Sequence, residues 1–159
     1  MRTSTASRPA WARRALTMLA TLATFAASLV ITGTTAAPAY AAACTGKKGV
    51  TVVVDFTKLG GKADTACDPT NPATGLAALT AAGFSYTFVP RLPGFVCTID
   101  ALPNPCNGAP VSAYWSYWHA KPHGKWVYSS LGAGSYNPAP GSVQGWAFGA
   151  GKAPGISPP

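Results

Sequence analysis

The chain has 159 residues, of which 48% are hydrophobic and 10% charged, and its formal net charge is +8. Four of its twelve basic residues lie in the first 14 positions, so eight face four aspartates in the rest of the chain, a net charge of about +4. These eight are scattered, without the basic run or helix that nucleic-acid binding uses. The composition therefore argues against a nucleic-acid-binding protein.

Residues 1–41 have the three parts of a secretory signal peptide. A basic start is followed by an apolar segment from Ala15 to Ile31 and by the cleavage signal Ala39-Tyr40-Ala41. The apolar segment is shorter and richer in threonine than the roughly 20 apolar residues of a membrane span. We expect the mature chain to be secreted or associated with the cell surface, with no transmembrane segment.

Two variants of the export signal stay open. Arg13-Arg14 could be a twin-arginine signal, although the surrounding residues match it poorly. Ala41-Ala42-Ala43-Cys44 could be a lipoprotein cleavage site with a lipidated Cys44, although the usual leucine three residues before the cysteine is missing. Ordinary secretory cleavage is the better interpretation.

The part after the signal peptide suits one domain, which we place at residues 42–149. Four cysteines in an exported chain predict two disulfides, with three possible connectivities. The turn-rich segment between Cys97 and Cys106 can bring these two together, which leaves Cys44 to pair with Cys67. No C-x-x-C pair or Cys/His cluster supports a zinc site instead.

The first half of this domain predicts a strand, a turn, a second strand and a helix. Gly49–Phe56 is apolar and rich in valine, which is typical of a buried strand, and Lys62–Cys67 can return beside it. Asn71-Pro72 predicts the cap and first turn of a helix over Ala73–Ala82, which ends at Gly83.

The second half predicts short strands, followed by a frayed tail over residues 150–159. Together with the helix they indicate an α+β fold with about five mostly antiparallel strands. The predicted strands are Phe84–Val89, Phe95–Ile99, Tyr114–His119, Trp126–Ser129 and Val143–Phe148.

The strand Tyr114–His119 is aromatic on both faces, because successive side chains of a strand point to opposite sides. Core packing explains most rings in small β domains. One sheet and one helix offer only one core face, however, so we expect some rings to form an exposed platform. The candidate ligand-binding residues are Tyr114, Trp115, Tyr117, Trp118, His119, Trp126 and Trp146.

No group of residues predicts catalysis. The part after the signal peptide has no glutamate, and its aspartates lie at strand ends or in turns without a catalytic partner. Nucleophile-elbow, zinc-protease and phosphate-loop motifs are absent. His119 and His123 flank a turn without a third metal ligand, so contact with an organic ligand is the better hypothesis. We expect a non-enzyme with no catalytic residues, metal or intrinsic cofactor.

The order of these motifs resembles the transcobalamin-like C-terminal domain family, over nearly the whole mature chain. The aromatic segment followed by a Gly-x-Val-x-x-aromatic strand is its more specific part. Two departures occur: a longer turn over His119–Gly124 replaces an Asn-Gly turn, and Ser142 replaces an acid before the last strand. The segments that carry the resemblance are Val50–Phe56, Gly75–Phe84, Phe95–Asp100, Tyr114–Trp118 and Gly141–Phe148.

This resemblance implies a small β-grasp-like domain, which in vitamin B12 carriers closes over the corrinoid against a helical α/α-barrel domain. Since this chain has no helical barrel, it implies half of a corrinoid site, completed by a helical partner protein. The alternative is an extracellular or cell-surface module that binds glycan or protein through its aromatic strand. A third hypothesis is an inhibitor that presents the loop between Cys97 and Cys106.

Overall fold

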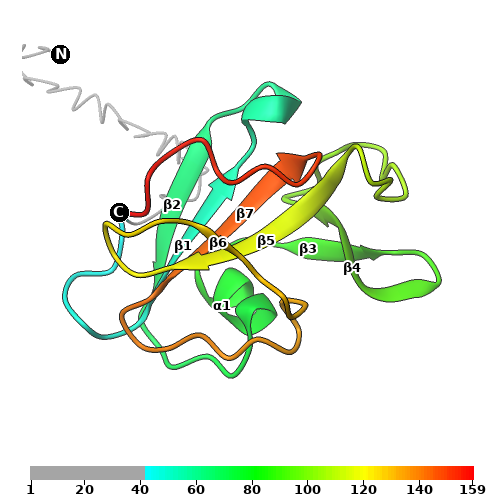
Figure 1. The fold of residues 1–159 in the computed structure, drawn as a ribbon. Coiled ribbons are helices and arrows are strands. Elements are labelled where there is room, and N and C mark those ends of the chain that lie inside the picture. Colours follow the sequence, from blue (N-terminus) through cyan, green and yellow to red (C-terminus); the bar gives the residue numbers. More distant parts are fainter. Residues whose placement is uncertain (1–41) are drawn as a thin grey trace, which may run out of the picture. The chain divides into compact units, whose positions relative to one another are not determined.

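The structure is a computed structural model that describes residues 42–159, so the predicted signal peptide lies outside the described residues. The described part contains one α-helix, one short 3₁₀ helix and seven strands (Figure 1). In chain order these are β1 (Val50–Asp55), η1 (Thr57–Leu59), β2 (Ala63–Asp68), α1 (Gly75–Ala81), β3 (Tyr86–Val89), β4 (Leu92–Ile99), β5 (Tyr114–Ala120), β6 (Val127–Tyr128) and β7 (Val143–Gly149).

Five strands form one sheet in the order β2-β1-β7-β5-β6, and β3 and β4 form a separate hairpin. The last strand, β7, lies beside the first and runs parallel to it, while the other neighbours are antiparallel. A first hairpin, a crossover helix and a last strand inserted beside the first make a β-grasp arrangement. The predicted small α+β domain is therefore confirmed. Five of its seven strands form the main sheet, and the other two, β3 and β4, pair with each other.

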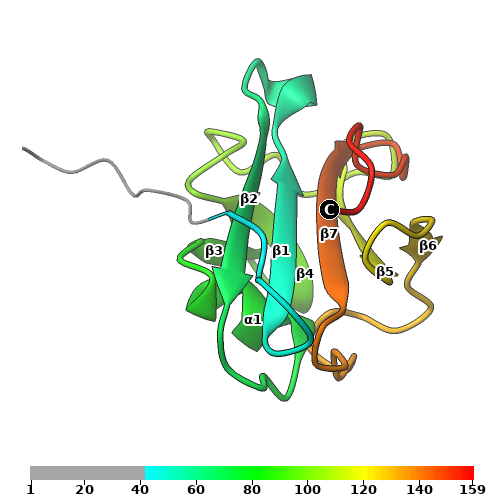
Figure 2. The same ribbon diagram turned by 90° about the vertical axis from the view of Figure 1, so that its left-hand side faces the viewer.

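The interior strand β1 is buried over its whole length, because both faces of the sheet are covered. Valine dominates β1, as expected for a strand with no solvent face. In Figure 2, α1 lies to the left of β7, and the red C-terminal segment lies to its right. The sheet is therefore a middle layer rather than one wall of a single core.

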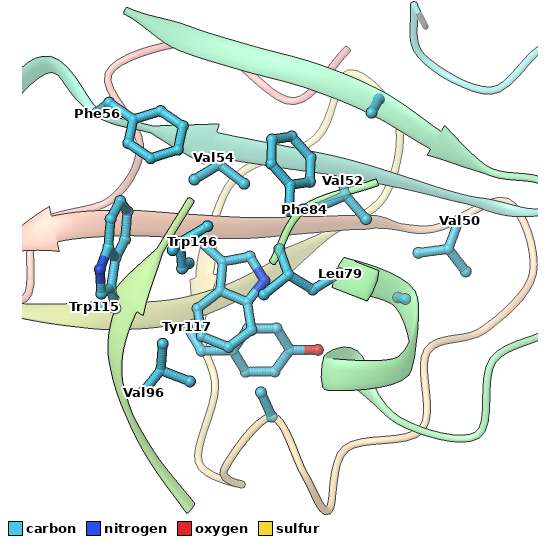
Figure 3. Packing of buried hydrophobic residues seen from close by; sticks show 14 residues of the cluster. Val50, Val52, Val54, Phe56, Leu79, Phe84, Val96, Trp115, Tyr117 and Trp146 are labelled. Atoms are coloured by element: carbon cyan, nitrogen blue, oxygen red, sulfur yellow. The ribbon is translucent and has the colours of Figure 1, made fainter. Parts of the chain in front are cut away.

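The main core fills the space between the sheet, α1 and the β3–β4 hairpin (Figure 3). Burying one such side chain contributes about 1.5–3 kcal/mol to stability. This core consists of Val50, Val52, Val54, Phe56, Ala66, Ala78, Leu79, Phe84, Val96, Ile99, Trp115, Tyr117, Ala133 and Trp146.

Helix α1 begins at Gly75 and is capped by Thr74, so the prediction of an Asn71 cap is wrong. The Thr74 hydroxyl accepts a hydrogen bond from the Ala77 amide at 3.0 Å, which is the usual geometry of a threonine cap. The first two helical amides, of Gly75 and Leu76, donate to carbonyls in the segment before β7. Tertiary contacts therefore supply partners for the first turn.

Both predicted disulfides are present, Cys44–Cys67 and Cys97–Cys106. The first ties the chain before β1 to the edge strand β2, and the second closes the loop after β4. Each such bridge stabilises a small domain by about 2–4 kcal/mol.

The C-terminal segment, predicted to be frayed, instead packs against the sheet face opposite α1. The Gly155 amide donates to Asp55 Oδ2 at 2.6 Å, and the Trp126 indole donates to the Ile156 carbonyl at 2.7 Å. Pro154 is buried, and glycine at position 145 of β7 leaves room for it and for the Trp126 ring. Composition alone misled the prediction, because small residues and prolines can lie flat on a sheet.

Asp55 makes this attachment pH-dependent. Burial opposes its ionisation, but hydrogen bonds from Thr57 and Gly155 and the nearby Lys58 charge outweigh that effect, so the pKa of Asp55 is lowered. An unfolded aspartate has a pKa of about 3.9. The folded state therefore binds fewer protons, and the resulting stability is complete above about pH 5 and is lost as the pH falls through the lowered value.

We expect the urea midpoint of the mature protein to fall between about pH 5 and pH 3, and to fall less in Asp55→Asn, which cannot ionise there. Hydrogen exchange of the Gly155 amide should report the same release. Asp64→Asn, on β2, controls for the loss of one carboxylate and should leave the exchange of the Gly155 amide unchanged. Identical pH profiles for wild type and Asp55→Asn would contradict the assignment.

Candidate functional site

The rings of the aromatic strand β5 divide between the two faces of the sheet. Trp115 and Tyr117 point into the main core, where Trp146 of β7 packs on Tyr117 with ring centroids 4.8 Å apart (Figure 3). Trp115 lies edge-on between Phe56 and Phe148. Core packing therefore accounts for these three candidate residues.

Tyr117 also carries the polar part of this core. Its hydroxyl donates to Gln144 Oε1, and Gln144 Nε2 donates to Ser142 Oγ at 3.2 Å. Burial, with the neighbouring Tyr136, raises the pKa of Tyr117, so the hydroxyl stays protonated and acts as a donor. A fully buried glutamine is tolerated here because both ends of its amide are bonded.

Tyr114 and Trp118 of β5 form a partly exposed aromatic cluster with Tyr128 of β6. The Trp118 and Tyr128 rings meet edge-to-face at 5.0 Å, and the two tyrosine hydroxyls lie 3.3 Å apart. Trp118 also donates to the buried Ser116 hydroxyl at 2.9 Å, which fixes the indole. Tyr128 is 49% exposed, so this cluster presents part of its ring surface to solvent.

The last two candidates lie apart from this cluster. Trp126 covers Val53, Ala120 and Val143 on the tail-covered face. His119 stacks on Tyr136 with centroids 4.6 Å apart and 16° between the ring planes. The candidate residues are therefore not brought together into one platform.

A groove of about 320 Å³ lies beside the first half of β5. The two residues of β6 pair with Trp118 and His119 of β5. The part of β5 that precedes Trp118 is not covered by β6, and its edge borders the groove. Core rings form its floor, and Phe95 and Leu131, which are 59% and 52% exposed, stand at its rim. It is lined by Gly94, Phe95, Val96, Tyr114, Trp115, Tyr117, Tyr128, Ser129, Ser130, Leu131, Gly132, Ala133 and Trp146.

The rim residues Phe95 and Leu131 do not follow from the sequence pattern. Phe95 has the pattern of an ordinary strand residue, and only the structure leaves its ring in solvent. Leu131 stands alone between Ser130 and Gly132, and an isolated leucine in a Gly/Ser-rich stretch is the one signal that could have pointed to it.

Within residues 42–159, no group of three or more His, Cys, Asp or Glu side chains is placed to hold a metal ion. His123 lies in the turn after β5, where its backbone amide donates to the Pro158 carbonyl at 3.1 Å. In the same range, no helix has the length and apolar character needed to cross a membrane.

Comparison with protein families matches the second half of the described chain. Residues 107–156 are similar to the SCO2322-like domain, a family description that names no ligand or reaction. The matched stretch contains β5, β6, β7 and most of the C-terminal segment. No curated protein and no solved structure matches the chain.

The contact between Tyr117 and α1 can be tested at Gly75. A methyl group there would collide with the Tyr117 hydroxyl oxygen, so we expect Gly75→Ala to destabilise the fold by about 1–3 kcal/mol in urea unfolding. Gly132→Ala is the matched control, because a methyl group there meets no atom within 4 Å. Equal stability of the two variants would show that the helix can move away from the ring.

Proposed function

We propose that the mature domain is a secreted, non-enzymatic binding module, and that the groove beside β5 takes one side of a flat, largely apolar ring ligand. The observation that carries this proposal is the composition of the groove: aromatic and aliphatic side chains with serine and tyrosine hydroxyls. The lining contains no carboxylate, histidine or lysine, so it offers ring contact and neutral hydrogen bonds rather than proton transfer.

A corrinoid is the ligand class implied by the resemblance to transcobalamin-like domains. It is much larger than a groove of about 320 Å³, so this domain would cover only part of it. The exposed Phe95 and Leu131 would lie against the ring system, and its other side would remain open. An open second side is consistent with a helical α/α-barrel partner that completes the site.

Two further features support an extracellular setting. The two disulfides need an oxidising compartment to persist, and the predicted signal peptide would deliver the chain there. Both proposals, ligand and location, concern the mature chain from residue 42 onward.

The test is titration of the purified mature protein with cobalamin, alone and with a candidate barrel protein, followed by absorption spectroscopy and calorimetry. We expect binding that strengthens with the barrel protein. Phe95→Ser and Leu131→Ser should each weaken it about tenfold, which corresponds to about 1.4 kcal/mol, because each removes an apolar contact. Val111→Ser is the matched control, since Val111 is 90% exposed and lies outside the groove lining.

Absence of any spectral or calorimetric change, with or without the barrel protein, would exclude the corrinoid. Equal weakening in Val111→Ser would show that the groove is not the site. A shift that includes Trp118 but not the rim residues Phe95 and Leu131 would favour the second candidate function instead.

That second candidate is glycan or protein binding through the cluster of Tyr114, Trp118 and Tyr128, and it rests on the exposed ring surface of Tyr128 beside a fixed Trp118. Aromatic faces of this kind stack on sugar rings and dock proteins. Pull-down with insoluble cell-wall polysaccharide should then retain the wild type and lose Trp118→Ala. Phe95→Ser and Leu131→Ser, which change the groove rim but not this cluster, should keep polysaccharide binding.

A further inference from the structure

A second hollow, of about 460 Å³, lies at the end of β5 and shares no lining residue with the groove. It is built by the end of β5, the turn after it, β6 and the segment that leads into β7. Its lining is His119, Ala120, Lys121, Gly124, Lys125, Val127, Tyr136, Ala139 and Ser142.

One wall of this hollow is a pair of parallel rings. His119 and Tyr136 stack at 4.6 Å with 16° between their planes, and Tyr136 is held in turn by an edge contact with Tyr117 at 5.8 Å. The backbone carbonyl of Tyr136 also accepts the first amide of α1 at 3.0 Å. Val127, which is 51% exposed, adds an aliphatic surface beside the rings. The ring pair is therefore held in place, with an aliphatic neighbour in Val127.

The opening of the hollow is positively charged. Lys121 and Lys125 both line it and both are exposed. Among residues 42–159 the ion pair present within 4.0 Å is Lys62–Asp64, so neither of these lysines is neutralised by a carboxylate. Two unpaired ammonium groups beside an apolar wall attract an anion that carries an apolar body.

Two neutral groups can complete the recognition of that anion. Ser142 Oγ accepts from Gln144 Nε2, which leaves its own proton for another acceptor. Burial lowers the pKa of His119, so its ring is neutral near neutral pH and offers one N–H donor. The lining of the hollow therefore combines hydrogen-bond donors and two ammonium groups with a pair of aromatic rings.

We propose that this hollow binds a small anionic ligand with a flat aromatic ring, such as an aryl phosphate or an aryl carboxylate. The ring lies against His119, Tyr136 and Val127. The anionic group is held by Lys121, Lys125 and the Ser142 hydroxyl. This site is distinct from the groove, because the two share no lining residue.

The experiment follows the backbone and histidine-ring NMR signals of the mature protein during titration with phenyl phosphate, benzoate, inorganic phosphate and benzyl alcohol. We expect phenyl phosphate and benzoate to shift the signals of His119, Val127 and Tyr136. Inorganic phosphate carries only the anionic group and benzyl alcohol only the aromatic ring, so each should bind at least tenfold more weakly. Bound anion should also raise the pKa of His119, because it stabilises the charged imidazolium.

Variants separate charge from ring contact. Lys121→Ala/Lys125→Ala should weaken phenyl phosphate about tenfold, and Val127→Ser should weaken phenyl phosphate but leave inorganic phosphate unchanged. Lys58→Ala/Lys62→Ala is the matched control with the same loss of charge. Lys58 lies in η1 and Lys62 follows it, both beyond the end of β1. Ser142 is bonded to Thr51 at the start of β1, about 16 Å away at the rise of a strand.

Three results would overturn the proposal. Equal affinity for inorganic phosphate and phenyl phosphate would show attraction to charge alone. Equal weakening in Lys58→Ala/Lys62→Ala would show a general effect of net charge. Shifts centred on groove residues such as Phe95 and Leu131 would place the ligand in the groove and remove this site.

Discussion

The ring of Tyr117 lies where the sheet, the helix and the segment before β7 meet. It packs on Trp146, touches the first turn of α1 at Gly75, and donates its hydroxyl proton to the buried Gln144. The amide of the same Gly75 donates to the Tyr136 carbonyl, so the loop that carries Tyr136 is bonded to the helix that Tyr117 supports. A change in the position of this ring would therefore move the groove, the helix and the second hollow together.

Covering both faces of the sheet is the second constraint. A five-stranded sheet in a chain of this size needs apolar cover on each side, and the only α-helix in the described residues serves one side. The C-terminal segment and Trp126 serve the other side, fastened by hydrogen bonds to Asp55 and Ile156. This cover is thin and built from small residues, which is why a glycine at position 145 matters as much as the rings around it.

Because most of the aromatic residues serve this packing, the surfaces proposed for binding lie at the borders of the aromatic strand. The groove opens where β6 stops pairing with β5, and the second hollow opens where β5 ends. Both depend on the segment from residue 129 to 142, which has no regular secondary structure and is held by α1 and by ring contacts of Tyr136. The match to the SCO2322-like domain contains this whole segment.

The sequence by itself determined the local elements and the covalent frame. Valine repeats in β1, the alternation of rings in β5 and the cysteine spacing depend on neighbouring residues, so strands, one helix and both disulfides could be predicted. Only the tertiary structure decided which rings are buried, because a strand that is aromatic on both faces does not reveal which face the helix covers. It also decided that the C-terminal segment packs, since the partners of Gly155 and Ile156 lie 100 and 30 residues away in the chain. The groove and the hollow arise in the same way, from segments that no local pattern brings together.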